Sequence, residues 1–365
     1  ILVTGSRGFL GKNLVVRLKE LNYEVSEFAR NDSIEFLQKI IAESDVVVHL
    51  AGENRPPNTL EYSKVNVGLT REICNAISIV GKKIPIIFSS SSQAEKDNFY
   101  GKSKLEAEKL LEQWAIESDN PVSIYRLPGI FGKWCKPNYN SVVATFCNNI
   151  AKGLHIEISN PNFSLRLVYV DDVIDEIISS IRNEADGIRR AEVNPEYLIT
   201  LGDLAKQIEL FKESRGTLVS EAVGVGLVRA LYSTYISYLP VENFSYELPI
   251  YGDDRGEFVE MLKTKDSGQF SYFTAHPGVT RGGHYHHTKS EKFLVIRGQA
   301  LFRFRNVISG ERYEISVQGG IPRVVETIPG WTHDVTNIGN EELVVMLWAN
   351  EIFDRSNPDT IADKV

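Results

Sequence analysis

Three glycines near the start of the chain, Gly5, Gly8 and Gly11, limit its fold more than any other feature of the sequence. They follow a short apolar run and precede an amphipathic stretch, so they occupy the junction between a first strand and a first helix. Glycine allows a tight turn and the close approach of the backbone to a pyrophosphate, which then meets the free N–H groups of the helix. The spacing therefore predicts a dinucleotide-binding α/β domain with these glycines at the phosphates.

The apolar runs after this junction continue the same pattern to about residue 130. Strand candidates alternate with amphipathic helices, which is typical of a parallel sheet with helices on both faces. The strand candidates are Ile1–Thr4, Tyr23–Phe28, Val46–Leu50, Ile84–Ser89 and Val122–Leu127, and the helix candidates include Asn13–Leu21 and Lys104–Glu117. From there to residue 243 the pattern is mostly helical and ends in Leu218–Leu239.

After Pro240 the pattern changes to short β-rich runs separated by Gly, Pro and Asp, which indicates an all-β sandwich or barrel. These runs are Glu257–Thr264, Phe270–Thr274, Phe293–Ile296, Ala300–Phe304 and Leu343–Trp348. A chain of 365 residues is also longer than one core usually supports. We therefore expect a dinucleotide-binding domain over residues 1–243 and a β-barrel domain over residues 244–365.

Composition excludes several classes of protein. A formal net charge of -8 argues against a nucleic-acid binder, which normally has a basic face. The apolar runs are all shorter than a membrane span, so we expect no membrane association. Cys74, Cys135 and Cys147 lack metal-ligand spacing and are typical of thiols in a reducing compartment. The expected location is the cytoplasm.

The end of the second strand indicates which cofactor binds. NAD-binding sites usually place an acidic residue there for the ribose hydroxyls, but this strand ends Phe28-Ala29-Arg30. Arg7 lies in the glycine loop, where it can share a 2′-phosphate with Arg30. Two arginines without the acid favour NADPH; the alternative is that both are solvated surface charges.

Tyr100 and Lys104 lie four residues apart, which places both side chains on one face of a helix. A nearby ammonium lowers the pKa of a phenol, so this tyrosine can exchange protons at neutral pH. The run Ser89–Ser92 follows a strand and can place a hydroxyl beside the tyrosine. A tyrosine and lysine at this spacing are common, but here they accompany the glycine loop.

With these residues, the first 240 or so positions resemble the extended short-chain dehydrogenase/reductase family. The matching segments are TGSRGFLG (4–11), VVVHLAG (46–52), Asn66, FSSSSQ (88–93), YGKSK (100–104), RLPGIFG (126–132) and VYVDDV (168–173). The resemblance implies a Rossmann-like fold, a nucleotide-sugar substrate and a homodimer.

The same resemblance implies roles for single residues. Ser91 is the serine of a Ser–Tyr–Lys triad, with Ser90 and Ser92 as alternatives because QAEKDN replaces the usual VYG after the serines. Tyr100 exchanges a proton with the sugar O4, and Lys104 holds the nicotinamide ribose. The other expected cofactor contacts are Gly5, Arg7, Gly8, Phe9, Leu10, Gly11, Arg30, Leu50, Ala51 and Gly52.

The second domain contains a metal-ligand pattern, Gly278-x5-His284-x-His286-x4-Glu291-x6-Gly298, followed by Pro329-Gly330-x2-His333-x3-Asn337. Histidines two apart on a strand point to the same side, and Glu291 and His333 can join them from neighbouring strands. This spacing resembles the two motifs of the cupins, although Pro329 stands one place later than usual and His287 can replace His286. Three imidazoles and a carboxylate suit Zn, Fe, Mn or Ni, and we expect a divalent metal, zinc first.

Two further segments, DRGEFVE (254–260) and RGGHY (281–285), resemble the metal-free 3,5-epimerases of dTDP-4-keto-6-deoxy sugars. That resemblance implies that His284 is a catalytic base, whereas the cupin pattern implies that it is a ligand. We prefer the ligand role because His286 and Glu291 accompany it.

The domain order, reductase then cupin, resembles the bifunctional capsular polysaccharide biosynthesis enzymes of bacteria. The resemblance implies that the cupin epimerises C3 of a UDP-linked 4-keto-6-deoxy amino sugar. The reductase domain then reduces the C4 ketone with NADPH to give UDP-2-acetamido-2,6-dideoxy-L-talose.

Other functions also fit the sequence. The first is an NAD-dependent nucleotide-sugar 4-epimerase or 4,6-dehydratase whose cupin domain has a regulatory or binding role. The second is a cupin that binds sugar or supports assembly without catalysis. A metal-dependent oxygenase is a further possibility, although nothing in the sequence indicates a 2-oxoacid site.

Overall fold

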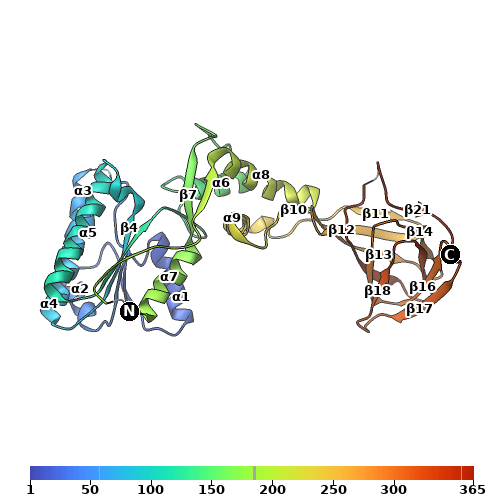
Figure 1. Cartoon of the computed structure of the whole chain (residues 1–365), viewed down its shortest axis with the longest axis horizontal. Coiled ribbons are helices and arrows are strands. Elements are labelled where there is room, and N and C mark those ends of the chain that lie inside the picture. The colour runs from blue at the N-terminus through green and yellow to red at the C-terminus, as the bar shows by residue number, and fades with distance from the viewer. Residues whose placement is uncertain (57, 184–185, 355) are drawn as a thin grey trace. The chain divides into compact units, whose positions relative to one another are not determined.

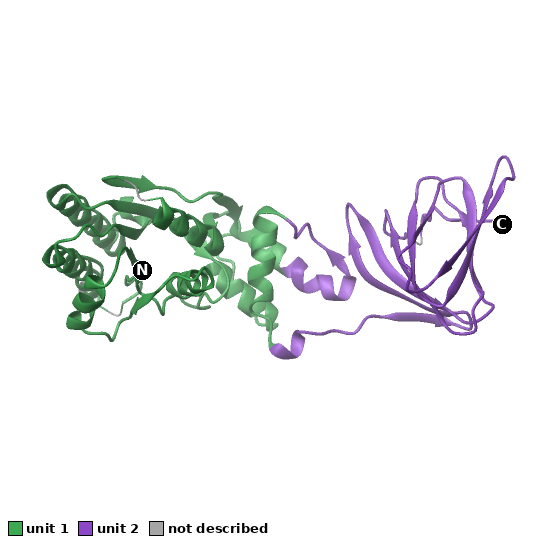
Figure 2. Ribbon diagram, turned by 90° about the horizontal axis from the view of Figure 1, so that it is seen from below, with its two compact units in different colours: residues 1–208, 225–240 green, residues 209–224, 241–365 purple. Residues whose placement is uncertain are grey.

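The chain forms two compact units, coloured separately in Figure 2. The computed structural model describes residues 1–56, 58–183, 186–354 and 356–365. The first unit comprises residues 1–208 and 225–240, and the second comprises 209–224 and 241–365. The chain therefore does not divide at residue 243 alone, as the sequence predicted, because residues 209–224 belong to the second unit. Within this segment, strand β10 (Val219–Ser220) pairs in parallel with β12 (Gly256–Thr264).

A six-stranded sheet forms the centre of the first unit, in the order β2-β1-β3-β4-β5-β8. All neighbouring strands are parallel. Their bounds are β1 Leu2–Thr4, β2 Ser26–Phe28, β3 Val47–His49, β4 Ile86–Ser91, β5 Val122–Leu127 and β8 Ile188–Ala191. The strand order reverses at β1, and ligands of open α/β sheets bind beside the carboxyl ends of the strands at such a point.

Helices cover both faces of this sheet, as Figure 1 shows. On one face, α2 (Ile34–Ala42), α4 (Leu69–Val80) and α5 (Phe99–Ser118) bury an apolar cluster that includes Leu37, Ile77 and Leu111. On the other, α1 (Phe9–Glu20) and α7 (Val170–Arg182) bury a second cluster that includes Leu14 and Ile177. Short helical segments lie at Leu60–Tyr62, Ser63–Gly68 and Ser92–Glu95.

Residues 130–243 contain more strand than the sequence predicted. A three-stranded sheet joins β6 (Gly129–Phe131), β7 (Ser164–Tyr169) and β9 (Tyr197–Thr200). The helices of this region are α6 (Val142–Ala151), α8 (Leu201–Thr217) and α9 (Gly226–Ile236). The predicted helix over Leu218–Leu239 was wrong in its first half, because Gly226 has a φ of 61°, a left-handed conformation that interrupts a helix.

Apart from the last turns of α8 and a 3-10 turn at Val241–Asn243, the second unit consists of two β-sheets, as expected for a cupin barrel. One sheet has the order β10-β12-β13-β20-β15-β18, with β11 paired to β12; the other has the order β17-β16-β19-β14-β21. The bounds are β11 Ile250–Asp253, β13 Gly268–Ala275, β14 Thr280–Tyr285, β15 Glu291–Arg297, β16 Gln299–Asn306, β17 Arg312–Gln318, β18 Val324–Thr327, β19 Trp331–Asn337, β20 Leu343–Ala349 and β21 Ile361–Ala362. Phe293, Phe302 and Val345 belong to the core between the sheets.

No described helix is both long enough and apolar enough to cross a membrane.

Two glycines of the loop after β1 are required by close packing. Gly5 has a φ of 68°, and a Cβ there would lie 2.8 Å from the Ala51 nitrogen. A Cβ on Gly11 would lie 2.1 Å from the Gly5 carbonyl oxygen. The loop therefore folds back on itself and against the end of β3, with no space for a side chain at these two positions.

We expect Gly11→Ala to lower the unfolding free energy of the first unit by about 1–3 kcal/mol, the usual cost of overpacking. Gly68→Ala is the matched control, because a Cβ there has its nearest neighbour 3.9 Å away. Urea unfolding followed by circular dichroism measures both. Equal stability of the two variants would contradict this account of the loop.

Candidate functional site

The glycine loop lies at the position where the strand order of the first unit reverses. Gly8 precedes α1 and donates its N–H to the Gly5 carbonyl at 2.8 Å. Because Gly8 has no side chain to cap the helix, the first turn of α1 keeps N–H groups available for an anion. Leu50, Ala51 and Gly52 follow β3, and Leu50 and Ala51 adjoin this loop. The loop and the β3 end therefore form the expected crevice for a dinucleotide.

The arginines expected at the cofactor lie in different surroundings. Arg7 is exposed in the glycine loop. Arg30 follows β2 and forms an ion pair with Glu53, which is largely buried beyond the end of β3. The Tyr139 hydroxyl also donates to Glu53, at 3.5 Å. The sequence pattern showed no carboxylate near Arg30 because Glu53 comes from a different strand end, which only the order β2-β1-β3 brings close.

Tyr100 and Lys104 lie on the first two turns of α5, beside the end of β4. Burial raises the pKa of Tyr100 above its usual value, and a hydrogen bond with Ser91 opposes this rise. The expectation that this pKa would be lowered was wrong, because burial raises it more than the hydrogen bond with Ser91 lowers it. The phenol is therefore protonated at neutral pH, as a proton donor requires.

Lys104 is almost fully buried, and its Nζ donates to the Ser89 carbonyl at 2.9 Å. Burial lowers the pKa of Lys104 to about 8. The Nζ also lies 4.8 Å from the centre of the Phe88 ring, where a cation is attracted to the ring face. A Cβ on Gly52 would lie 3.0 Å from this Nζ, so Lys104 reaches the crevice of the glycine loop.

The serines at the end of β4 differ in their partners. The Ser91 hydroxyl pairs with Tyr100 and accepts the Gln93 N–H at 3.1 Å. The Ser90 hydroxyl donates to Glu108. Ser92 lies in the short helical turn that follows. Among the described residues, Ser91 is thus the serine of this run whose hydroxyl pairs with Tyr100.

Glu108 is a buried residue that the sequence pattern did not single out. Its carboxylate accepts hydrogen bonds from Ser90 and, at 2.7 Å and 3.0 Å, from the Arg126 guanidinium. Arg190 lies 3.3 Å away. The side chain has no exposed surface. The sequence feature that could have identified Glu108 is its place four residues after Lys104, on the same helix face.

His284, His286, Glu291 and His333 converge in the second unit. Each offers a ligand atom, and these atoms all lie within 4.8 Å of one another. His284 lies on β14 and His286 just after it, Glu291 begins β15, and His333 lies on β19. His287 is exposed and outside this cluster. The spacing argument therefore selected the same four side chains that the fold brings together.

The cluster fits a divalent metal. Nε2 of His286 and Nε2 of His333 lie 3.4 Å and 3.3 Å from the same oxygen of Glu291. The His333 Nε2 is buried and, among the described residues, lacks a partner with hydrogen-bond geometry. Burial and the neighbouring His333 lower the pKa of His284 to about 4, so this imidazole is neutral at pH 7. A neutral imidazole is the form in which histidine binds a metal.

Glu291 is charged despite its burial. Burial by itself raises the pKa of a carboxyl group, but contacts with His286, His333 and Lys289 hold the pKa of Glu291 well below its usual value. The Lys289 Nζ lies 2.9 Å from the second oxygen of Glu291. One carboxylate oxygen therefore faces the imidazoles and the other faces an ammonium.

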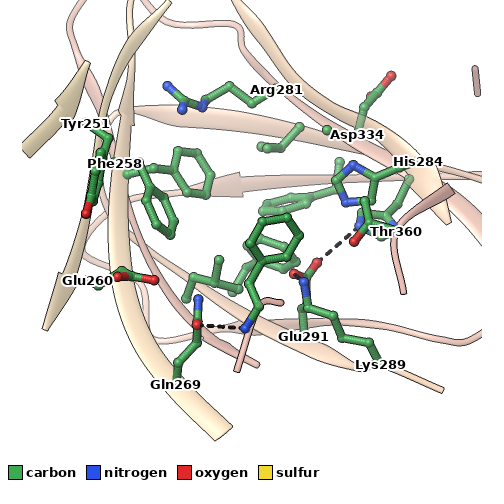
Figure 3. A pocket seen from close by; sticks show the side chains of 18 of the residues that line it. Tyr251, Phe258, Glu260, Gln269, Arg281, His284, Lys289, Glu291, Asp334 and Thr360 are labelled. Atoms are coloured by element: carbon green, nitrogen blue, oxygen red, sulfur yellow. Dashed lines mark hydrogen bonds and ion pairs between the residues drawn. The ribbon is translucent and has the colours of Figure 1, made fainter. Parts of the chain in front are cut away.

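His284, Lys289, Glu291 and His333 line a cavity of about 700 Å³. Figure 3 shows His284, Glu291 and Lys289 gathered on one side, with Tyr251, Phe258 and Glu260 on the other. Phenylalanines line much of the wall between, and Arg281 lies along one edge. The cavity has the size and the mixture of apolar wall and few polar groups that suit a small-molecule ligand.

Both parts of the chain match known families. Residues 1–194 match the NAD dependent epimerase/dehydratase family, and residues 251–361 match the polysaccharide biosynthesis C-terminal domain. A relative from Pseudomonas aeruginosa, UDP-2-acetamido-2,6-beta-L-arabino-hexul-4-ose reductase, is 51% identical over 366 residues, covering 100% of this chain and 98% of the relative.

Solved structures agree with this relationship. The capsular polysaccharide assembling protein CapF from Staphylococcus aureus superposes with a TM-score of 0.92 and 42% identity, covering 100% of this chain and 99% of that chain. A UDP-glucose 4-epimerase from Thermotoga maritima superposes with a TM-score of 0.57 and 20% identity over 65% of this chain, which shows the fold alone. The expected resemblance to bifunctional capsular polysaccharide enzymes is confirmed: the chain belongs to the NAD dependent epimerase/dehydratase family, joined here to a polysaccharide biosynthesis C-terminal domain.

Proposed function

We propose that this chain is a bifunctional nucleotide-sugar enzyme of capsular polysaccharide synthesis. The second unit epimerises C3 of a UDP-4-keto-6-deoxy-HexNAc, and the first unit reduces the C4 ketone with NADPH to UDP-2-acetamido-2,6-dideoxy-L-talose. The observation that carries this proposal is the full-length relationship, at 51% identity, to a protein named as a reductase of a UDP-linked 4-ulose. The 4-epimerase relatives align with at most 58% of this chain, so an NAD-dependent 4-epimerase is less well supported.

In the first unit, bound NADPH supplies a hydride to C4. Tyr100 donates its proton to O4 as the alkoxide forms, and the Ser91 hydroxyl orients the phenol. Lys104, with a pKa of about 8, keeps most of its positive charge at pH 7 and stabilises the developing negative charge on the tyrosine. Its position beside Gly52 also lets it hold the nicotinamide ribose.

In the second unit, the C4 ketone determines when epimerisation can occur. The ketone acidifies the C3 proton because the resulting negative charge delocalises onto O4. Once C4 is reduced this delocalisation is lost, so epimerisation must come first, and reduction then preserves the new configuration at C3. A divalent metal, for which we propose zinc, supplies a Lewis acid or a structural cross-link when His284, His286, Glu291 and His333 hold it.

NADPH is proposed over NADH because Arg7 and Arg30 can both meet a 2′-phosphate. Glu53 adjoins Arg30, so a phosphate at Arg30 must replace this carboxylate as its partner.

We also propose a homodimer in the cytoplasm, on the family resemblance and on three buried free cysteines typical of a reducing compartment.

The cofactor proposal predicts that Arg7→Ala together with Arg30→Ala raises the KM for NADPH about 10-fold or more and changes the KM for NADH little, because only NADPH carries the 2′-phosphate. Steady-state kinetics with each cofactor measures both values. Arg17→Ala, on the exposed face of α1, is the control. Equal effects on the two cofactors would refute the preference.

The reductase proposal predicts that Tyr100→Phe lowers kcat for ketone reduction by about 10²–10⁴-fold, because general acid catalysis is lost. Cofactor binding, followed by NADPH fluorescence, should be unchanged. Tyr62→Phe is the control, since its ring centre lies 6.0 Å from that of Tyr100 but its hydroxyl donates to the Asn54 carbonyl. Near-normal reduction by Tyr100→Phe would rule out this proton donor.

The epimerase proposal predicts deuterium at C3 when the 4-keto sugar is incubated with the enzyme in D₂O without NADPH. Tyr100→Phe should keep this exchange, and His333→Ala should lose it while circular dichroism shows a folded second unit. His276→Ala, a half-exposed histidine outside the cluster, is the control. Mass spectrometry and NMR measure the label. If wild-type enzyme shows no exchange, the second unit is not an epimerase.

A further inference from the structure

The segment 359–363 lies against the cluster of His284, His286, Glu291 and His333. Its strand β21 pairs with β14, where Ala362 is opposite His284. The Asp363 carboxylate accepts a hydrogen bond from the Thr332 hydroxyl at 2.6 Å, and Thr332 directly precedes His333 on β19. The segment is therefore hydrogen-bonded to both strands that carry histidines of the cluster.

Asp359 makes contacts with four consecutive residues, 286–289. One carboxylate oxygen accepts the His287 N–H at 2.8 Å. The other accepts the Thr288 N–H at 2.7 Å, the Thr288 hydroxyl at 2.9 Å and the Lys289 N–H at 2.9 Å. The Asp359 main-chain carbonyl accepts a hydrogen bond from Nδ1 of His286. A single residue thus holds four of the five residues that connect β14 and β15, and the fifth, Ser290, donates its N–H to the Asn350 side chain.

These contacts determine which atoms of the cluster face inward. Because Nδ1 of His286 donates to the Asp359 carbonyl, its Nε2 is the nitrogen left for a ligand, and it lies 3.4 Å from Glu291. Because Asp359 holds the Lys289 backbone, the Lys289 Nζ stays 2.9 Å from one oxygen of Glu291 and leaves the other oxygen to the histidines. Outer hydrogen bonds of this kind orient metal ligands and tune their affinity.

We propose that Asp359 is a positioning residue for the metal centre of the second unit: it sets the orientation of His286 and, through Lys289, restricts Glu291 to one ligand oxygen. This inference rests on the proposed metal site. Asp359 does not line the cavity, whereas His284, Glu291 and His333 do, and it acts through residues 286–289.

The test measures metal affinity, with Zn²⁺ alone as the probe, in the full-length chain. Zn²⁺ dissociation constants are obtained by competition with a chromophoric chelator, and the absorption spectrum of the Co²⁺ form reports the ligand geometry. Asp359→Asn keeps the size of the side chain, but its NH₂ group faces a backbone N–H in place of an acceptor oxygen. We expect affinity to fall about 10–100-fold, as for other outer partners of metal ligands, with a changed Co²⁺ spectrum.

Asp354→Asn is the matched control, because this carboxylate lies five residues earlier in the chain and accepts hydrogen bonds from the Ser356 N–H and hydroxyl. It should bind Zn²⁺ like the wild type. Circular dichroism establishes that the second unit of each variant is folded. If Asp359→Asn binds Zn²⁺ with wild-type affinity and shows the wild-type Co²⁺ spectrum, the positioning role is overturned and the proposed metal site stands. If the wild type and Asp354→Asn both fail to bind Zn²⁺, the metal site itself is overturned, and the role of Asp359 is overturned with it.

Discussion

The buried carboxylate of Glu108 holds together the parts of the reductase site. It lies on α5 and is hydrogen-bonded to Ser90 on β4 and to Arg126 on β5. A charge without exposed surface is costly unless it is paired and hydrogen-bonded, so the helix and both strands must keep their relative positions to satisfy it. Tyr100 and Lys104 precede Glu108 on this helix, and Ser91 follows Ser90 on the strand. Their alignment is therefore a consequence of one buried ionic network.

Burial has different outcomes at the two sites. In the first unit, Lys104 lacks a close carboxylate partner strong enough to outweigh burial, and its pKa falls to about 8. In the second unit, Glu291 is also buried, but two imidazoles and the Lys289 ammonium surround it and keep it charged. The first arrangement yields a lysine that can respond to charge on a neighbouring phenol. The second yields a fixed anion among imidazoles, which is the charge pattern that attracts a cation.

Sequence determined those features of this protein that depend on local spacing. The glycines at 5, 8 and 11 follow from the geometry of one strand–turn–helix junction, and the pairing of Tyr100 with Lys104 follows from the helical repeat. The position of His284 and His286 on one side follows from the alternation of a strand. These are properties of a few consecutive residues, so the order of amino acids alone is enough to predict them.

Tertiary structure decided the features that join distant segments. It selected Ser91 among its neighbours because Glu108, 18 residues from Ser90, occupies the Ser90 hydroxyl. It placed Glu53 beside Arg30 because β1 lies between β2 and β3 in the sheet. It brought Asp359 to a loop 72 residues earlier in the chain. Local periodicity carries no information on such contacts, because they depend on strand order and on the packing of segments that only the complete fold brings together.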